Sequence, residues 1–141
     1  MDANQDLFSG EKHATGFSAV AESCEAEALD LNALLVRRRA ATFFVRMVGE
    51  SMTGAGIRPG DILVVDRSLE PSDGTPVVAF AGGEFVVRFW RRAGNRVSLE
   101  ASDPDTSPIV GEGDREIRLF GVVTACVHRF AKGPEKAGNP R

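Results

Sequence analysis

Ser51 has the surroundings that a nucleophilic serine requires. It lies in a glycine-rich segment between two apolar runs. Glycines such as Gly49 adopt positive φ angles readily, so a tight turn here can hold a hydroxyl away from a sheet. In such a turn we expect the backbone N–H groups of Met52 and Thr53 to be free to bind an anion, which is the geometry of a nucleophile with its oxyanion hole. A glycine–x–serine segment on its own is more often a plain turn.

The whole segment is far more specific than the serine alone. Gly-x-Ser-Met at residues 49–52 is followed by Gly-Ile-x-x-Gly-Asp-x-Leu-x-Val-Asp at residues 56–66. This pattern resembles the self-cleaving serine peptidase domain of LexA repressors and UmuD proteins. The resemblance covers about residues 15–127 and implies that Ser51 is the nucleophile. It also implies a small, mostly β domain with a curled or barrel-like sheet, of the β-clip type that LexA shares with signal peptidases.

The position of the general base holds an unexpected residue. In the LexA and UmuD family a lysine follows the serine at a nearly fixed interval, on the strand after a Gly-Glu-Phe hairpin. Here Gly-Glu-Phe occupies residues 83–85, and the matching position, 37 residues after Ser51, is Arg88. A buried lysine can lose its proton, whereas arginine is a donor only and its neutral fraction at pH 7 is on the order of 10⁻⁵ or less. The remaining lysines lie near the two ends of the chain, at Lys12, Lys132 and Lys136.

Three interpretations of Arg88 follow. In the first, the dyad is inactive and the protein works uncleaved as a binding subunit. In the second, cleavage persists because water or a partner-induced shift supplies the base. In the third, Arg88 turns away, pairs with Glu84 or stacks on Trp90, and leaves Ser51 as a plain turn residue.

Residues 1–29 are expected to form a flexible N-terminal arm, followed by a peptidase-like domain at 30–130 and a loose tail at 131–141. UmuD proteins are cut in this arm between a small residue and Gly-Phe, and the matching bond here is Thr15–Gly16, before Phe17. Thr15 is larger than the family's usual Cys or Ala. Ser9–Gly10 is a weaker second candidate.

Composition favours strands over helices and sets limits on partners. The chain has 141 residues, fifteen glycines and 43% hydrophobic residues, enough for one domain with a core. Its net charge of −3 argues against broad electrostatic binding to nucleic acid. No apolar run is long enough to span a bilayer, so a cytoplasmic location is expected. Cysteines and histidines are isolated at Cys24, Cys126, His13 and His128, so neither a metal nor a cofactor is predicted.

The elements that must position the serine follow from periodicity and turn residues. A short helix is predicted over 30–39 with Asp30 as its cap. In the strand predicted over 84–91, alternation places Phe85 and Val87 on one face and Arg88 on the other. A long last strand should bend at Gly121. Strands are predicted at 42–48, 62–65, 76–80, 84–91, 96–101 and 116–129.

The resemblance implies an accessory subunit, like UmuD, of an error-prone translesion DNA polymerase in the SOS response to DNA damage. Its partners would be a second copy in a homodimer, a Y-family polymerase subunit and the RecA filament. The alternative is a truncated repressor-like regulator that acts by dimerising with full-length repressors and has no polymerase partner. A signal-peptidase-like protease fits less well, because position 88 lacks the lysine that such an enzyme uses.

Overall fold

The structure, a computed structural model, describes residues 29–111 and 116–130. The chain divides into two compact units, residues 1–40 and 41–141. In the first unit the described residues form the short helix α2 (Leu31–Leu35). Its predicted cap is confirmed, since the Asp30 carboxylate accepts hydrogen bonds from the N–H groups of Asn32 and Ala33. The helix ends earlier than predicted, because the β-branched residue Val36 takes an extended conformation.

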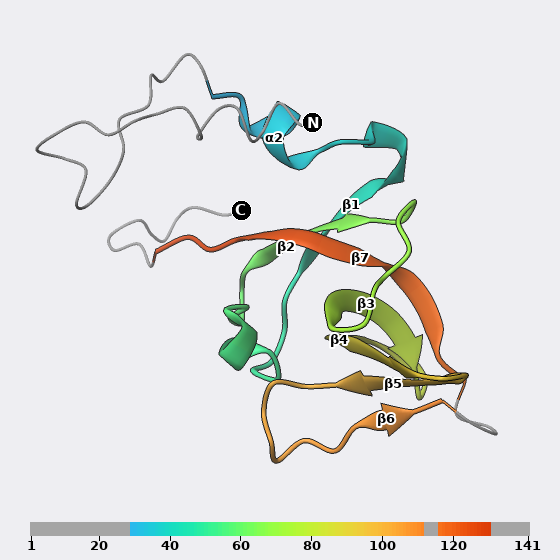
Figure 1. Cartoon of the computed structure of the whole chain (residues 1–141). Coiled ribbons are helices and arrows are strands. Elements are labelled where there is room, and N and C mark those ends of the chain that lie inside the picture. Colours follow the sequence, from blue (N-terminus) through green and yellow to red (C-terminus); the bar gives the residue numbers. More distant parts are fainter. Residues whose placement is uncertain (1–28, 112–115, 131–141) are drawn as a thin grey trace, which may run out of the picture. The chain divides into compact units, whose positions relative to one another are not determined.

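Seven strands in the second unit form one antiparallel sheet with the order β1-β2-β7-β3-β4-β5-β6 (Figure 1). The prediction of a mostly β domain is confirmed. Because β1 and β6 are the two ends of this order, the sheet is open rather than a closed barrel. The strands are β1 (Thr42–Arg46), β2 (Ile62–Asp66), β3 (Thr75–Ala81), β4 (Glu84–Ala93), β5 (Arg96–Glu100), β6 (Ile109–Val110) and β7 (Arg118–Val127).

Most strand boundaries fall close to the predicted ones, and the differences have local causes. β1 ends at Arg46 instead of residue 48, because Met47 already donates its N–H to the carbonyl of Asp61 at 2.8 Å and begins the turn. β6 was not predicted, since two residues are too few to show a period. No helix within the described ranges is long and apolar enough to cross a membrane.

Two hydrophobic clusters pack against the sheet. Met52, Leu63 and Val65 are fully buried members of the first cluster, and Leu99 is a fully buried member of the second. β4 contributes to both clusters by alternation: Val87 and Phe89 pack in the first, while Val86 and Trp90 pack in the second. The predicted two-faced pattern of this strand is therefore confirmed.

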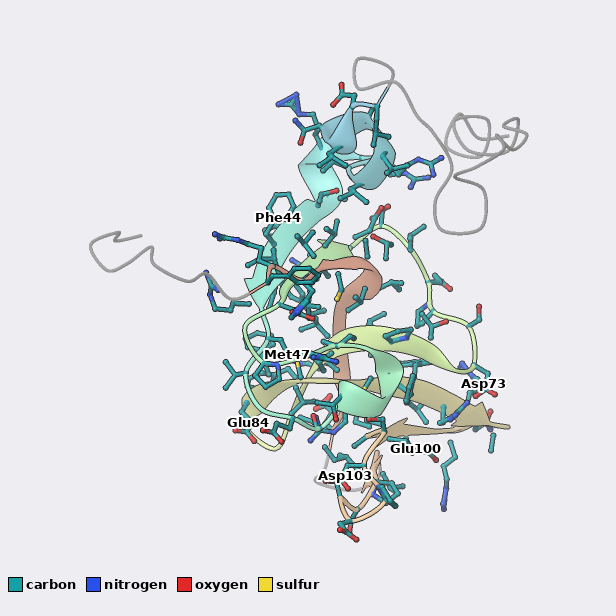
Figure 2. The ribbon with its side chains drawn as sticks, turned by 90° about the vertical axis from the view of Figure 1, so that its left-hand side faces the viewer. Phe44, Met47, Asp73, Glu84, Glu100 and Asp103 are labelled. Atoms are coloured by element: carbon teal, nitrogen blue, oxygen red, sulfur yellow. The ribbon has the colours of Figure 1, made fainter. Side chains whose placement is uncertain are left out.

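Side chains on the sheet's first strand differ sharply in exposure. Figure 2 shows Phe44 projecting from β1 and Met47 lying within the body of the domain, in agreement with exposed fractions of 61% and 3%. Among the described strands β1 pairs only with β2, so it is an edge strand of the sheet. This edge is the part of the sheet at which another strand could add.

β7 carries two bulges, one on each side of its centre. Thr124 is an extra residue opposite the step from Val64 to Val65 of β2. Phe120 is an extra residue opposite the step from Val78 to Ala79 of β3. The predicted bend at Gly121 thus lies directly beside the bulge at Phe120. Bulges of this kind bend the strand that carries them.

Candidate functional site

The turn between β1 and β2 presents Ser51. Two hydrogen bonds join the two ends of this turn. Met47 N–H donates to the carbonyl of Asp61 and Gly60 N–H donates to the carbonyl of Met47, both at 2.8 Å. Gly49 has a φ of 88°, a conformation that glycine adopts without strain. Met52 follows the serine and is fully buried in the first hydrophobic cluster, which pins the turn to the domain.

Ser51 and Arg88 are in direct contact. The guanidinium donates from Nη1 to Oγ of Ser51 at 2.9 Å, and also to the carbonyl of Val87 at 2.9 Å. The two positions that the family motif assigns to nucleophile and base therefore lie side by side. The interpretation in which Arg88 turns away toward Glu84 or Trp90 is wrong.

In the part of the chain that the structure describes, no ion pair neutralises the charge of Arg88. No carboxylate of residues 29–111 or 116–130 lies within ion-pairing distance of its guanidinium. Its Nε is buried and has no hydrogen-bond partner there. Burial lowers the pKa of Arg88 from its ordinary value, and the negative charge of Glu84 opposes that shift. Arginine nevertheless stays protonated in proteins, so it holds the hydroxyl as a donor and does not accept its proton.

Ser102 anchors the serine turn, a role that the sequence did not indicate. Its N–H donates to the carbonyl of Ser51 at 2.9 Å, and its hydroxyl donates to the same carbonyl at 3.1 Å. The Ser102 hydroxyl also accepts from Gly54 N–H at 2.9 Å. A Cβ on Gly54 would come within 3.0 Å of Ser102, so glycine allows the loop after β5 to approach this closely.

Of the two backbone N–H groups that were expected to be free beside Ser51, one is already used in a hydrogen bond. The N–H of Thr53 is not free, because it donates to the carbonyl of Glu50 at 3.3 Å; the Thr53 hydroxyl donates to the same oxygen, also at 3.3 Å. That part of the oxyanion prediction is wrong, since the turn tightens into the 3-10 helix η3 (Thr53–Ala55). The N–H of Met52 donates to no atom of the described residues.

A buried carboxylate, that of Asp61, lies at the end of the turn where β2 begins. Asp61 is 2% exposed and accepts hydrogen bonds from Arg58 N–H at 2.9 Å and from the Cys126 thiol at 3.3 Å. Its other oxygen lies 2.7 Å from Nδ1 of His128. The Arg58 N–H, then the His128 and Cys126 hydrogen bonds, lower the pKa of Asp61, against an opposing effect of burial. His128 is thus not the isolated residue that the sequence suggested.

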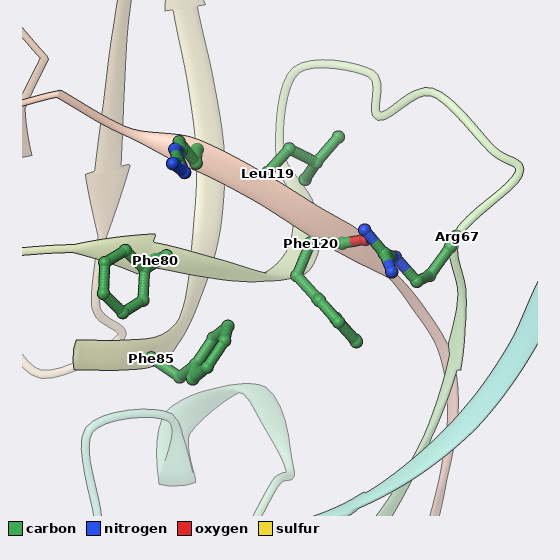
Figure 3. Close-up of a pocket in the computed structure, with 6 residues that line it drawn as sticks. Arg67, Phe80, Phe85, Leu119 and Phe120 are labelled. Atoms are coloured by element: carbon green, nitrogen blue, oxygen red, sulfur yellow. The ribbon is translucent and has the colours of Figure 1, made fainter. Parts of the chain in front are cut away.

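Aromatic side chains from β3, β4 and β7 line a pocket of about 470 Å³ (Figure 3). Phe85 stacks edge-on against both Phe80 and Phe120, with ring centroids 5.1 and 5.7 Å apart. The guanidinium of Arg67 lies 4.3 Å from the centroid of Phe120. The pocket also includes Arg118 and Leu119. No residue of the serine motif lines it.

The cleavage-site predictions cannot be placed beside this geometry. Thr15, Gly16 and the alternative bond Ser9–Gly10 lie outside the described residues. The lysines of both chain ends lie outside them as well. Within the described ranges, the Ser51 site therefore contains a nucleophile position, hydrogen-bond donors and a cation.

A mostly β domain that presents a serine on a glycine-rich turn, with a basic side chain bonded to its hydroxyl, has the plan of a serine peptidase domain. The sequence comparison gives the family. The chain belongs to the Peptidase S24-like family, whose sequence pattern matches residues 6–124. The resemblance to LexA and UmuD proteins is confirmed by this match and by the relatives below.

Curated relatives match most of the chain. The protein SamA of Salmonella typhimurium is 40% identical over 92% of this chain and 89% of its own length. The protein MucA of Escherichia coli is 42% identical over 77% of this chain and 75% of its own length. The LexA repressor of Bordetella petrii is 38% identical over 63% of this chain but only 40% of its own length.

Proposed function

We propose that this chain is an accessory subunit, like UmuD, of an error-prone translesion DNA polymerase in the SOS response, and that it acts without efficient self-cleavage. The resemblance to UmuD supports the first part. The hydrogen bond from Arg88 to Ser51 supports the second, because a protonated guanidinium cannot take the proton of the hydroxyl. In this proposal the protein works in the cytoplasm as a homodimer, and residues 1–29 form an arm that stays attached.

The polymerase partnership is tested by co-expression with the Y-family polymerase subunit of the same organism. We expect the two chains to co-elute from size-exclusion chromatography at equimolar ratio. The matched control is the same polymerase subunit expressed alone. A polymerase subunit that elutes identically with and without this chain would contradict the partnership.

The cleavage part is tested by restoring the family's base with Arg88→Lys. A lysine that is partly buried at this position can lose its proton and activate Ser51. Incubation with activated RecA filament should then yield a fragment that lacks the first fifteen residues, seen by mass spectrometry, whereas the wild-type chain stays intact.

Two controls make this result specific. Arg88→Lys combined with Ser51→Ala should stay intact, because the nucleophile is gone. Arg92→Lys, on the same strand and exposed, should behave as the wild type. If the Arg88→Lys chain remains intact with the filament, position 88 is not the place of the base.

The second candidate function is a repressor-type regulator without a polymerase partner. The match to the Bordetella petrii LexA repressor favours it, since that match covers only part of the repressor. Mixed dimers with a full-length LexA-type repressor, detected by native mass spectrometry, together with no polymerase binding, would select this function.

A further inference from the structure

The aromatic pocket of the second unit has no role in the chemistry at Ser51. Its described lining consists of four apolar residues and two arginines, namely Phe80, Phe85, Leu119 and Phe120 with Arg67 and Arg118. The volume of about 470 Å³ leaves room for a ligand, since ligand pockets in proteins measure about 300–1,000 Å³. The pocket therefore calls for an occupant of its own.

The apolar wall of the pocket is accessible to solvent. Phe85 is 62% exposed, although its ring packs edge-on between Phe80 and Phe120 (Figure 3). Exposed apolar surface beside polar groups is typical of interaction sites, and its burial on binding is favourable. Edge-to-face ring pairs form at centroid distances of about 4.5–7 Å, so a further aromatic ring can extend the row.

Arg67 is held at the pocket with unused donors. Its Nε donates to the carbonyl of Phe120 at 2.9 Å, and its guanidinium lies 4.3 Å from the ring centroid of Phe120 and 5.9 Å from that of Phe43. The Nη groups of Arg67 donate to no atom of the described residues. Because these contacts already order the side chain, a ligand that uses the Nη groups loses little conformational entropy on binding.

Arg118 brings a second positive charge to the pocket. Both Arg67 and Arg118 are exposed, and within residues 29–111 and 116–130 no carboxylate lies at ion-pairing distance from either. None of the described lining residues is acidic. Two cations beside an apolar wall are complementary to a ligand that carries negative charge next to an apolar group.

We propose that this pocket binds a peptide segment of a partner protein in which a phenylalanine lies between acidic residues. The phenylalanine packs against Phe85, and its acidic neighbours meet Arg67 and Arg118. Single-stranded nucleic acid fits less well, because the described lining offers two cations and the chain as a whole has a net charge of −3. This inference goes beyond the proposed function and holds with or without a polymerase partner.

The test uses the full chain and the probe peptide fluorescein-Glu-Asp-Phe-Glu-Asp-amide. Fluorescence anisotropy should show saturable binding below about 1 mM. Two control peptides separate the contributions of the ring and of the charge. In one, alanine replaces the phenylalanine; in the other, lysines replace the four acidic residues. Each control should bind about tenfold more weakly, or worse, than the probe.

Matched variants locate the binding on the protein. Phe85→Ala should weaken binding by about tenfold, whereas Phe44→Ala changes a side chain that is 61% exposed but outside the pocket and should bind as the wild type. Arg118→Gln should weaken binding by about threefold or more. Its control is Arg92→Gln, which removes the same charge at an exposed position outside the pocket.

Several results would overturn the proposal. The wild type fails to bind the probe, or Phe85→Ala binds it no more weakly than Phe44→Ala does. The lysine peptide binds as tightly as the acidic one, which would mean an apolar surface without charge preference. Labelled oligothymidylate of about ten nucleotides binds more tightly than the probe and is released by Phe85→Ala, which would assign the pocket to single-stranded DNA.

One more outcome concerns a second copy of this chain. If the wild type binds no probe and sediments as a dimer that Phe85→Ala dissociates, the pocket belongs to the contact between copies and the proposal is wrong. All of these measurements use the chain without a polymerase subunit, so their result is independent of the polymerase partnership.

Discussion

Lysine and arginine carry the same charge, but only lysine readily loses its proton when it is buried. At position 88 this difference decides whether the side chain next to Ser51 can act as a general base. With lysine, Ser51 faces a base; with arginine, it faces a permanent donor that holds its oxygen at 2.9 Å. A single guanidinium therefore places a permanent hydrogen-bond donor beside a serine that has the setting of a peptidase nucleophile.

A second residue whose pKa depends on its surroundings is Asp61. Its pKa is lowered in the folded state, chiefly by the N–H of Arg58. The stability that it contributes is therefore present above the pKa of an unfolded aspartate, about 3.9, and is lost as the pH falls through the lower folded value. We expect Asp61→Asn to be less stable than the wild type at pH 7 and to lose less stability on acidification.

Thermal unfolding followed by circular dichroism between pH 2 and 7 measures this effect. Asp105→Asn is the matched control, since Asp105 is exposed and its side chain makes no hydrogen bond within the described residues. Parallel stability curves for the wild type and Asp61→Asn would contradict the role given to this carboxylate.

Single residues also show where sequence reasoning stops. The adjacency of Ser51 and Arg88 was predictable, because a motif fixes their spacing. The contacts of Asp61 with His128 and of Ser51 with Ser102 were not, because each joins residues more than fifty positions apart. Lone polar residues leave no periodic signal, and only the completed sheet brings them together.

At the level of elements, apolar alternation predicted most strands and both faces of β4. It failed for β6, which is too short, and for the bulges of β7, which interrupt the period itself. Gly121, beside the second bulge, was visible in the sequence as a possible bend. The structure shows that a packing contact requires glycine there. A Cβ on Gly121 would lie 2.6 Å from Cγ1 of Val65, a fully buried side chain.

Gly121→Ala is therefore expected to destabilise the domain by about 1–3 kcal/mol through overpacking. Urea unfolding followed by tryptophan fluorescence of Trp90 measures the change. Val65→Ala removes the clashing methyl group and leaves a cavity, so the double variant should be more stable than the sum of the two single effects predicts. Strict additivity would show that the clash is relieved elsewhere.

At the scale of the whole molecule, the position of β1 at one end of the strand order bears on self-association. Phe44 is exposed on this strand, which pairs with β2 alone among the described strands. The proposed homodimer predicts sedimentation equilibrium at about twice the chain mass of 15.1 kDa. We expect Phe44→Asp to shift the equilibrium toward monomer, because a charge on an edge strand opposes pairing.

Phe130→Asp is the control for this prediction. Phe130 is exposed as well, but it lies after the end of β7 and on no strand edge. If the wild type sediments as a monomer at all concentrations, the homodimer is ruled out. If only Phe130→Asp dissociates it, the dimer does not use the β1 edge.

The paired bulges of β7 have a consequence for sequence change in this strand. Leu119 and Val122 pack on the same cluster although they are three positions apart, and Val123 and Cys126 do so on the other. Each extra residue switches the faces of the sheet to which the following side chains point, and the second switch restores the original alternation. Loss of one bulge residue would turn the remainder of the strand over, so deletions here should be tolerated only as a compensating pair.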